Sequence, residues 1–245
     1  MKSFPTFKRA SLAPKHNKRR FATATAALVC LVVAVPATAA VIEVGGDDPL
    51  PTPACPNNDT CRAVTGVTGY QTQVGSSKNP YRVKESGKVV ALTLKLPELT
   101  AAQKKFFEDN YEGDAKVKVS ILRPRPRRGV KYRYVLAGQS ESLNVTRYLN
   151  SEPTFPLRTS LTVRKNDIVA LTVETWVPAF AIQLDAKTAW RASRTSKDCK
   201  KLDKSTHEKQ GQVRVYGCQY TTAQLLYKAT VIPSPKPTSA APKAK

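Results

Sequence analysis

The stretch that decides the fold is LRTSLTVRKNDIVALTVETW, residues 157–176. Apolar and polar side chains alternate over residues 157–163, which is the period of a strand with one buried face. The alternation resumes after the polar residues 164–167, and both runs are rich in β-branched side chains. The stretch therefore predicts two antiparallel strands joined as a hairpin, with residues 164–167 as the turn.

The same alternation recurs in the rest of the chain. Residues 81–83 and 88–96 predict a second hairpin, and further strands are expected to begin near residues 62, 117, 132, 186, 213 and 225. Thr100 and Gln103 form a capping box, which predicts one short helix near residues 100–111. We therefore expect an all-β fold, an antiparallel β-sandwich that is jelly-roll-like and has nine or ten short strands.

The first forty residues contain no acidic group. A basic segment ends at Arg20, an apolar run follows, and the small residues 37–39 complete the pattern. This order predicts a secretory signal peptide over residues 1–39, cleaved after residue 39. The alternative is an uncleaved anchor over residues 21–44, which is just long enough to span a bilayer. In both cases the rest of the chain is expected to lie outside the cytoplasm.

Composition divides the remainder of the chain into three parts. Residues 40–54 are rich in Gly, Asp and Pro and are expected to form a linker. Residues 55–232 carry the strand patterns and are expected to form one β-sandwich domain. Residues 233–245, PSPKPTSAAPKAK, lack large apolar side chains and predict a disordered tail rich in Pro, Lys and Ala.

Four cysteines follow the leader: Cys55, Cys61, Cys199 and Cys218. An even number in an oxidising compartment indicates two disulfides, for which three connectivities exist. We favour the local pairs, Cys55 with Cys61 and Cys199 with Cys218. No metal site or cofactor is expected, because His207 is the only histidine after the leader and no CxxC spacing occurs.

The chain is strongly basic, with 40 Lys and Arg against 18 Asp and Glu. Residues 40–245 hold 33 of those cations and all 18 acids, which leaves a net charge of +15. A field of this sign favours polyanions as partners, although charge that only supports solubility would look the same.

The densest basic segment is RPRPRRGVKYR, residues 123–133. Arginine forks match phosphate, sulfate and carboxylate geometry, and the prolines stiffen the loop that presents them. The alternative is a solvated hairpin tip that is kept polar to prevent aggregation at a strand edge. The predicted binding residues are Arg123, Arg125, Arg127, Arg128, Lys131 and Arg133, with Tyr132 stacking on a sugar or base. Lys197, Lys200, Lys201 and Lys204 form a second, weaker basic cluster.

Few residues suggest catalysis. His207 lies in a polar loop with no nucleophile pattern around it, and no Gly-rich phosphate loop occurs. Carboxylates distant in sequence that converge in space would instead make a hydrolase. Trp176 and Trp190 are candidates for a sugar platform, but burial in the core is the favoured reading for both.

Four segments carry a family resemblance. The leader, the loop CPNNDTC followed by RAVTGVTGYQ, the segment KNDIVALTVETWVPAFA and the later TAWRAS together resemble uncharacterised secreted β-sandwich proteins of high-GC Gram-positive bacteria. The resemblance covers residues 55–231 and implies a secreted sandwich, but it transfers no activity and no site residue. Residues 163–173 are also similar to hairpins of carbohydrate-binding jelly rolls, which is a likeness of fold alone.

The sequence thus predicts a non-catalytic extracellular β-sandwich that binds anionic polymer, such as cell-envelope or acidic polysaccharide, through its basic loop. The alternatives are a secreted carboxylate-dependent hydrolase and a purely structural surface protein.

Overall fold

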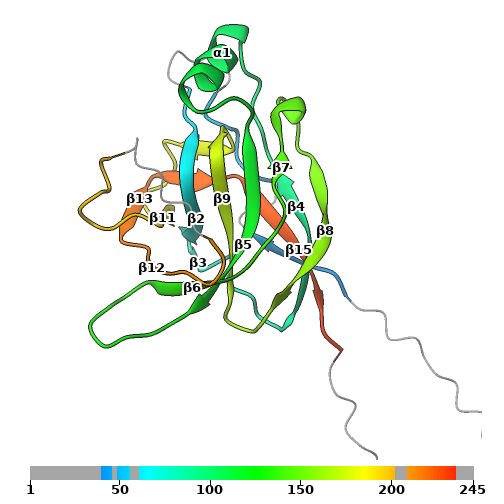
Figure 1. The fold of residues 1–245 in the computed structure, drawn as a ribbon, viewed down its shortest axis with the longest axis vertical. Helices are drawn as coiled ribbons and strands as arrows, with labels where there is room; N and C mark the ends of the chain where they lie inside the picture. The colour runs from blue at the N-terminus through cyan, green and yellow to red at the C-terminus, as the bar shows by residue number, and fades with distance from the viewer. Residues whose placement is uncertain (1–39, 46–48, 56–60, 202–208, 236–245) are drawn as a thin grey trace, which may run out of the picture. The chain divides into compact units, whose positions relative to one another are not determined.

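The computed structural model describes residues 40–45, 49–55, 61–201 and 209–235. They form an all-β, sandwich-like fold with a single α-helix, and every pairing between named strands is antiparallel (Figure 1). The predicted fold class is therefore confirmed. The leader, His207, Lys204 and most of the expected tail lie outside the described residues.

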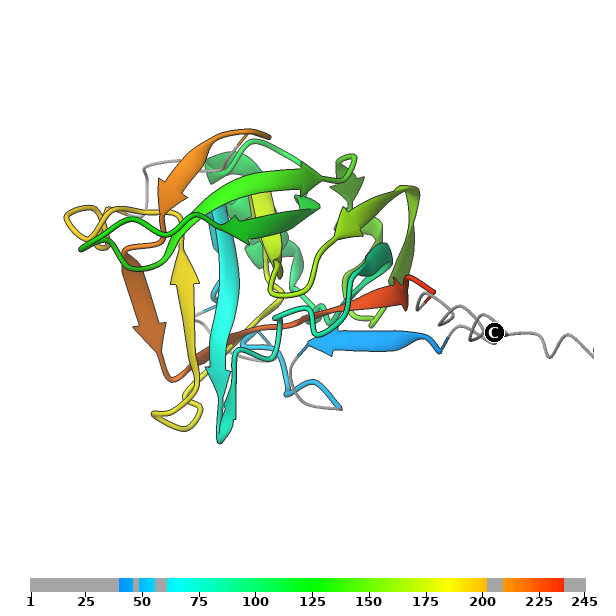
Figure 2. The same ribbon diagram turned by 90° about the horizontal axis from the view of Figure 1, so that it is seen from below.

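The smaller of the two main sheets has four strands. Its order is β1 (Ile42–Gly45), β15 (Tyr227–Pro233), β4 (Gly87–Leu94) and β8 (Thr154–Val163). Figure 2 shows β1 in blue beside β15 in red, which brings the first and last described strands together.

The larger sheet has nine strands and curls. Its main path runs through β12 (Val213–Val215), β6 (Arg133–Gln139), β5 (Lys116–Pro124), β9 (Ile168–Val177), β2 (Val64–Val74), β11 (Ala189–Ala192) and β13 (Cys218–Thr221). Two short strands pair outside this path, β3 (Ser77–Lys78) with β2 and β7 (Leu143–Asn144) with β5. A separate pair joins β10 (Phe180–Ile182) to β14 (Ala223–Leu225), and a 3-10 turn, η1, covers Thr146–Tyr148.

The hairpin predicted over residues 157–176 is wrong, although both of its strands exist. β8 pairs with β4 in the smaller sheet, whereas β9 lies at the centre of the larger sheet between β5 and β2. The polar turn between them is a corner that carries the chain from one sheet to the other. Two of its N–H groups are bonded to a distant segment: Asn166 N–H donates to the Val83 carbonyl at 2.9 Å, and Lys165 N–H donates to Ser86 Oγ at 3.1 Å.

The burial of the two strands follows from this arrangement. Only the last residue of β8 is buried, whereas the first six residues of β9 are all buried. A strand at the centre of a sheet that is covered on both faces is apolar on both sides, and its alternation then no longer marks a solvent face. The second predicted hairpin fails in the same way, because residues 81–83 pair with residues 167–169 rather than with β4.

The expected linker over residues 40–54 contains a strand. β1 pairs with β15 over four residues, Val44 is buried, and Leu50 is 1% exposed. The Gly, Asp and Pro content of the segment hid this short apolar alternation of Ile42 and Val44. The smaller sheet therefore includes residues that precede residue 55.

The predicted helix is α1 (Ala101–Asn110), and its capping box is present. Thr100 Oγ1 accepts from Gln103 N–H at 3.2 Å, and the Gln103 side chain accepts from Thr100 N–H at 2.9 Å. Phe107, the buried residue of the helix, stacks on Trp176 with ring centroids 4.9 Å apart. Trp176 itself has no exposed surface and donates from Nε1 to the Gly113 carbonyl at 2.6 Å. Burial of Trp176 in the core is confirmed.

Both predicted disulfides are present in the favoured local pairing. Cys55 is bonded to Cys61, with Cα atoms 4.5 Å apart, and Cys199 is bonded to Cys218, with Cα atoms 5.2 Å apart. Two disulfides in one domain indicate an oxidising, extracytoplasmic compartment. In the described part of the chain no helix has the length and apolar character needed to cross a membrane.

Candidate functional site

The basic segment predicted to bind polyanions is the connection of the β5–β6 hairpin. Arg123 pairs with Val135 and Pro124 with Tyr134, so the ladder closes immediately before the loop. Figure 1 shows the hairpin projecting from the end of the larger sheet that lies away from α1. The sequence placed this loop between two strands, and the structure does so too.

Arg123 does not contribute a free cation to this loop. Its Nε and Nη2 donate to the two carboxylate oxygens of Asp167 at 3.0 and 2.8 Å, which is a bidentate ion pair. The Asp167 side chain is 2% exposed and also accepts from Arg164 N–H at 2.9 Å. The hydrogen bond to Asp167 raises the pKa of Arg123, with burial opposing it. Arg123 therefore ties the hairpin to the corner between the two sheets.

Tyr132 and Arg133 also serve the hairpin itself. The guanidinium of Arg191 lies 3.5 Å from the centre of the Tyr132 ring, so one face of that ring is covered. The Tyr132 carbonyl accepts from Tyr216 N–H at 2.9 Å, and Arg133 Nη1 donates to the Arg125 carbonyl at 3.0 Å. Three of the seven predicted binding residues are thus engaged in holding the loop in place.

The other four predicted cations, Arg125, Arg127, Arg128 and Lys131, are exposed. We call these four residues the cationic tip. None of them forms an ion pair with any described residue, and no acidic residue occurs between residues 123 and 133. The four charges therefore face solvent without internal neutralisation.

The loop that carries the cationic tip is an ordered turn. Arg125 N–H donates to the Arg133 carbonyl at 2.9 Å, and Val130 N–H donates to the Arg127 carbonyl at 3.0 Å. Gly129 has φ +74°, a value that glycine adopts without strain, which allows the chain to reverse there. The rigid prolines before and within the loop restrict its remaining freedom.

A buried tyrosine cluster supports the base of the hairpin. The rings of Tyr70, Tyr134 and Tyr216 contact one another with centroids 5.5 Å apart, and the hydroxyls of Tyr70 and Tyr134 are 3.0 Å apart. Burial raises the pKa of Tyr70 far above its ordinary value, and the neighbouring Tyr134 adds to this. Arg191, 8% exposed, donates to the Tyr216 carbonyl at 3.0 Å and connects the cluster to Tyr132.

The second basic cluster is less concentrated. Lys197, Lys200 and Lys201 are exposed, and Lys204 lies outside the described residues. Lys201 forms an ion pair with Asp198 at 3.2 Å. Part of its charge is therefore neutralised within the loop, unlike that of the cationic tip.

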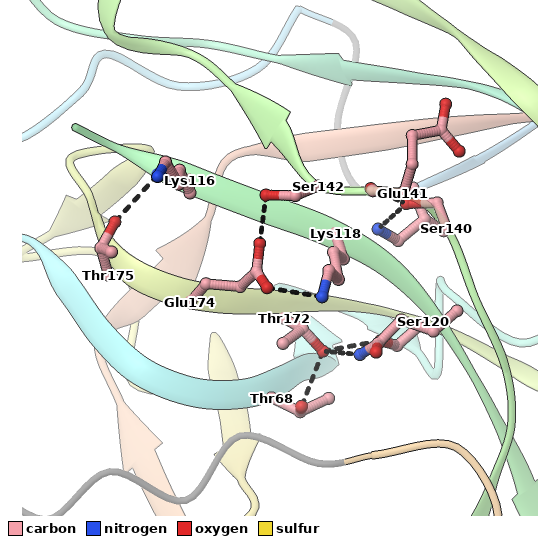
Figure 3. Close-up of polar contacts among 12 residues, drawn as sticks. Thr68, Lys116, Lys118, Ser120, Ser140, Glu141, Ser142, Thr172, Glu174 and Thr175 are labelled. Carbon is pink, nitrogen blue, oxygen red and sulfur yellow. Dashed lines mark hydrogen bonds and ion pairs between the residues drawn. The ribbon is translucent and has the colours of Figure 1, made fainter.

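A row of buried hydroxyls crosses the larger sheet, and no local pattern in the sequence marks it (Figure 3). Thr172 on β9 bonds to Thr68 on β2 at 2.7 Å and to Ser120 on β5 at 2.6 Å, and all three residues are fully buried. Gln139 on β6 donates to the Ser120 and Thr172 hydroxyls at 3.1 and 3.3 Å. The row joins four strands through side chains, and each hydroxyl in it has a partner.

The row continues toward solvent as a charged group (Figure 3). Glu174 accepts from Lys118 Nζ at 2.5 Å and from the Ser142 hydroxyl. The carboxylate is thus held by a cation and a hydroxyl on the neighbouring chain segments. This arrangement joins β5 and β9 near the α1 end. No local sequence pattern predicts it, since Ser142 and Glu174 are 32 residues apart.

Trp190 differs from Trp176. It is 5% exposed, stacks on Tyr220 with centroids 4.7 Å apart, and meets the edge of Phe180 at 5.8 Å. These three residues line a cavity of about 490 Å³, to which Arg62 and Arg194 also contribute. We call this space the aromatic cavity. The sequence predicts Trp190 as a core residue or a sugar platform, and no local pattern in it connects Trp190 with Phe180 and Tyr220.

Chemical groups that would hold a metal are not clustered in the part of the chain that the structure describes. No set of three or more His, Cys, Asp or Glu side chains converges there. His207, the histidine that the sequence singled out, lies outside the described residues.

Comparison of the chain with protein-family models, with curated proteins and with solved structures finds no match. The resemblance to secreted β-sandwich proteins of high-GC Gram-positive bacteria therefore stays a prediction. Any assignment of function has to come from the geometry of the sites described above.

Proposed function

We propose that the protein is a non-catalytic extracellular β-sandwich that binds anionic polymer of the cell envelope, or acidic polysaccharide, through the cationic tip. The observation that carries the proposal is the set of four exposed cations on one turn, Arg125, Arg127, Arg128 and Lys131, without an ion pair to any described residue. Neutralising such a cluster with a polyanion releases the counterions that surround both partners.

The order of the turn supports the proposal. A loop that is already fixed loses little conformational entropy when a ligand binds, so more of the contact energy appears as affinity. Two backbone hydrogen bonds, at 2.9 and 3.0 Å, close the turn, and the Arg191 side chain covers Tyr132 at its base. A tip that existed only for solubility would not need this support.

The chemistry of the tip favours phosphate, sulfate or carboxylate groups in a repeating chain. Three of its four cations are arginines, whose planar forks bind two oxygens at once. The chain from residue 40 onward is also basic overall, with 33 cations against 18 acids. That field attracts the same partners over a longer range and raises the rate of encounter.

The extracellular part of the proposal rests on the two disulfides and on the leader pattern of residues 1–39. The disulfides require an oxidising compartment, and the leader supplies a route of secretion. A polymer of the cell surface is the polyanion that such a protein meets first.

The test is equilibrium binding of the purified protein to two defined probes, long-chain polyphosphate and alginate. The tip variant replaces Arg125, Arg127, Arg128 and Lys131 with Ser. We expect its affinity to fall at least about tenfold for at least one probe. An unchanged affinity of this variant for both probes would contradict the proposal and favour the alternative of a purely structural surface protein.

The matched control removes the same charge elsewhere. It replaces Lys84, Lys88, Lys187 and Lys197, four exposed lysines outside the hairpin, with Ser. We expect a clearly smaller loss from this variant, and equal losses would indicate diffuse attraction without a site. A third variant that changes the three tip arginines to Lys keeps the charge and tests the fork geometry.

A further inference from the structure

The aromatic cavity has the size and lining of a small-molecule site. Its volume of about 490 Å³ lies within the range of about 300–1,000 Å³ typical of ligand pockets. It is bounded by the start of β2, by the β10–β14 pair and by Trp190 and Tyr220 on β11 and β13. Tyr111, which ends α1, completes the wall.

One side of the cavity is an aromatic wall. Trp190 and Tyr220 are opposite each other in the β11–β13 ladder and stack at 26°, and Phe180 packs edge-on against the indole. The indole reaches this position because Gly69 has no side chain. A Cβ there would lie 2.9 Å from Trp190 Cζ3, which is closer than real contacts allow. β2 is therefore built to let a large ring lie against it.

The other side of the cavity is cationic. Arg194 is 3% exposed, and its Nη2 donates to the Thr65 carbonyl at 3.4 Å, which fixes the guanidinium beside the start of β2. Arg62 is exposed and lies three residues before Thr65 on the same chain segment. None of the described residues that line the cavity is acidic. The described lining of the cavity thus carries positively charged side chains and no carboxylate.

A buried donor in the wall lacks an acceptor. Trp190 Nε1 has no hydrogen-bond partner among the described residues, although it is buried. Indole N–H groups usually find an acceptor when they are buried, so an unsatisfied one beside a cavity needs an explanation. An oxygen atom of a bound ligand would provide the missing acceptor.

From these observations we infer that the aromatic cavity binds a small, flat organic acid, with its ring against Trp190 and Tyr220 and its carboxylate at Arg62 and Arg194. An apolar ring matches the aromatic wall, and a carboxylate matches both the arginines and the indole N–H. The lining also holds hydroxyl and amide side chains, Thr65, Gln183 and Thr222 among them, so a sugar acid is tested as the competing ligand. This function is separate from the cationic tip, which lies on a different hairpin.

The probes are 2-naphthoate, its neutral counterpart 2-naphthamide, and D-glucuronate, each titrated into the purified protein by calorimetry. We expect 2-naphthoate to bind with one-to-one stoichiometry and at least about tenfold more tightly than 2-naphthamide, because the amide lacks the charge. Tighter binding of glucuronate than of naphthoate would overturn the assignment of an apolar ring. Absence of naphthoate binding up to about 1 mM, which is an affinity weaker than about −4.1 kcal/mol, would overturn the site.

Variants then locate the binding. Arg62→Gln should weaken 2-naphthoate binding about tenfold and leave 2-naphthamide unchanged. Arg82→Gln, which removes another exposed arginine that does not line the cavity, should change neither. Ala63→Phe, which fills part of the cavity from a half-buried position, should abolish binding of both probes. Equal binding to this variant, with its thermal unfolding unchanged, would contradict the assignment.

A spectroscopic readout does not depend on any variant remaining folded. The chain has two tryptophans, so its ¹H–¹⁵N spectrum contains two indole signals. We expect 2-naphthoate to shift the signal of Trp190 and to leave that of Trp176, whose Nε1 is already bonded to Gly113, in place. A Trp190 signal that does not move at saturating naphthoate would refute the proposal. The tip variant should bind 2-naphthoate like the unmodified protein, so failure of either proposal is recognised separately.

Discussion

The ion pair between Arg123 and Asp167 predicts that Arg123 stabilises the fold, whereas the exposed cations of the same loop do not. Measurements of unfolding can distinguish these two roles. The Asp167 side chain is 2% exposed and accepts from both Nε and Nη2 of Arg123, whose side chain is 29% exposed. Replacing Arg123 with Leu leaves a buried carboxylate with one remaining bond, that from Arg164 N–H at 2.9 Å. Replacing the exposed Arg125 with Leu removes the same charge but leaves no buried carboxylate without its cation.

Removing one partner of a buried ion pair costs about 3–5 kcal/mol, mainly because the other charge stays buried. The remaining bond to Asp167 and the partial exposure of Arg123 place the expected cost at about 3 kcal/mol. For a domain of 150–250 residues, each kcal/mol of lost stability lowers Tm by about 2–4 °C. The Tm of Arg123→Leu should therefore be about 6–12 °C lower than that of the unmodified protein. Arg125→Leu should change the free energy of unfolding by about 0.5 kcal/mol or less.

A double-mutant cycle measured by urea denaturation completes this test. Asp167→Asn removes the buried charge and keeps an oxygen for Arg164 N–H. The double variant with Arg123→Leu should therefore be more stable than Arg123→Leu alone, because no unpaired carboxylate remains. The reasoning is refuted if Arg123→Leu costs no more than Arg125→Leu, or if the effects of the two single changes simply add.

Three further stability predictions use other parts of the fold. Replacing Cys199 and Cys218 together with Ala should lower the free energy of unfolding by about 3 kcal/mol, since the bond closes a loop with a sequence separation of 19; an unchanged urea midpoint would contradict this. Trp176→Ala should cost about 3–5 kcal/mol, because the indole is fully buried against α1, and a loss below about 1 kcal/mol would show that the helix does not depend on it. Thr172→Val keeps the shape of the side chain but removes the central hydroxyl of the buried row. It should cost about 1–3 kcal/mol in the same assay, whereas neutrality would mean that the neighbouring hydroxyls find other partners.

Local patterns allowed much of the secondary structure to be predicted. The capping box at Thr100 marked the start of α1 because both of its hydrogen bonds form within four residues. The strands expected near residues 62 and 117 are β2 and β5, and in β5 the alternating Val117, Val119 and Ile121 are all buried in the final fold. The local disulfides were also predictable, since the shortest loops were the right ones.

The pairing of strands was not predictable in the same way. The corner at residues 164–167 has the composition of a hairpin turn, but Asn166 bonds to Val83 and Lys165 to Ser86, which lie 83 and 79 residues earlier in the chain. Nothing in the local sequence distinguishes a turn that closes a ladder from one that changes sheets. The choice is made by long-range contacts, which a local pattern does not contain.

The candidate site, too, was predictable only where it depends on local sequence. The density of basic residues marks the β5–β6 hairpin, but it predicts the same binding role for Arg123 as for Arg127 and a ligand-stacking role for Tyr132. The structure separates them through Asp167 and Arg191, two partners that lie far along the chain. The aromatic cavity was beyond reach of the sequence for the same reason, since its lining comes from five strands and the end of a helix.

The central claim is that the cationic tip is the binding site for anionic polymer, and the salt dependence of affinity tests it most directly. The dissociation constant for polyphosphate is measured between about 50 and 300 mM salt for the unmodified protein, the tip variant and the matched control, in which Lys84, Lys88, Lys187 and Lys197 are replaced with Ser. If each tip cation displaces about 0.7 counterion, as on a single-stranded polyanion, loss of all four should reduce the slope of log Kd against log salt by about 3. The control variant should keep a slope close to that of the unmodified protein. Slopes that fall equally in both variants, or that do not fall in the tip variant, would contradict the account.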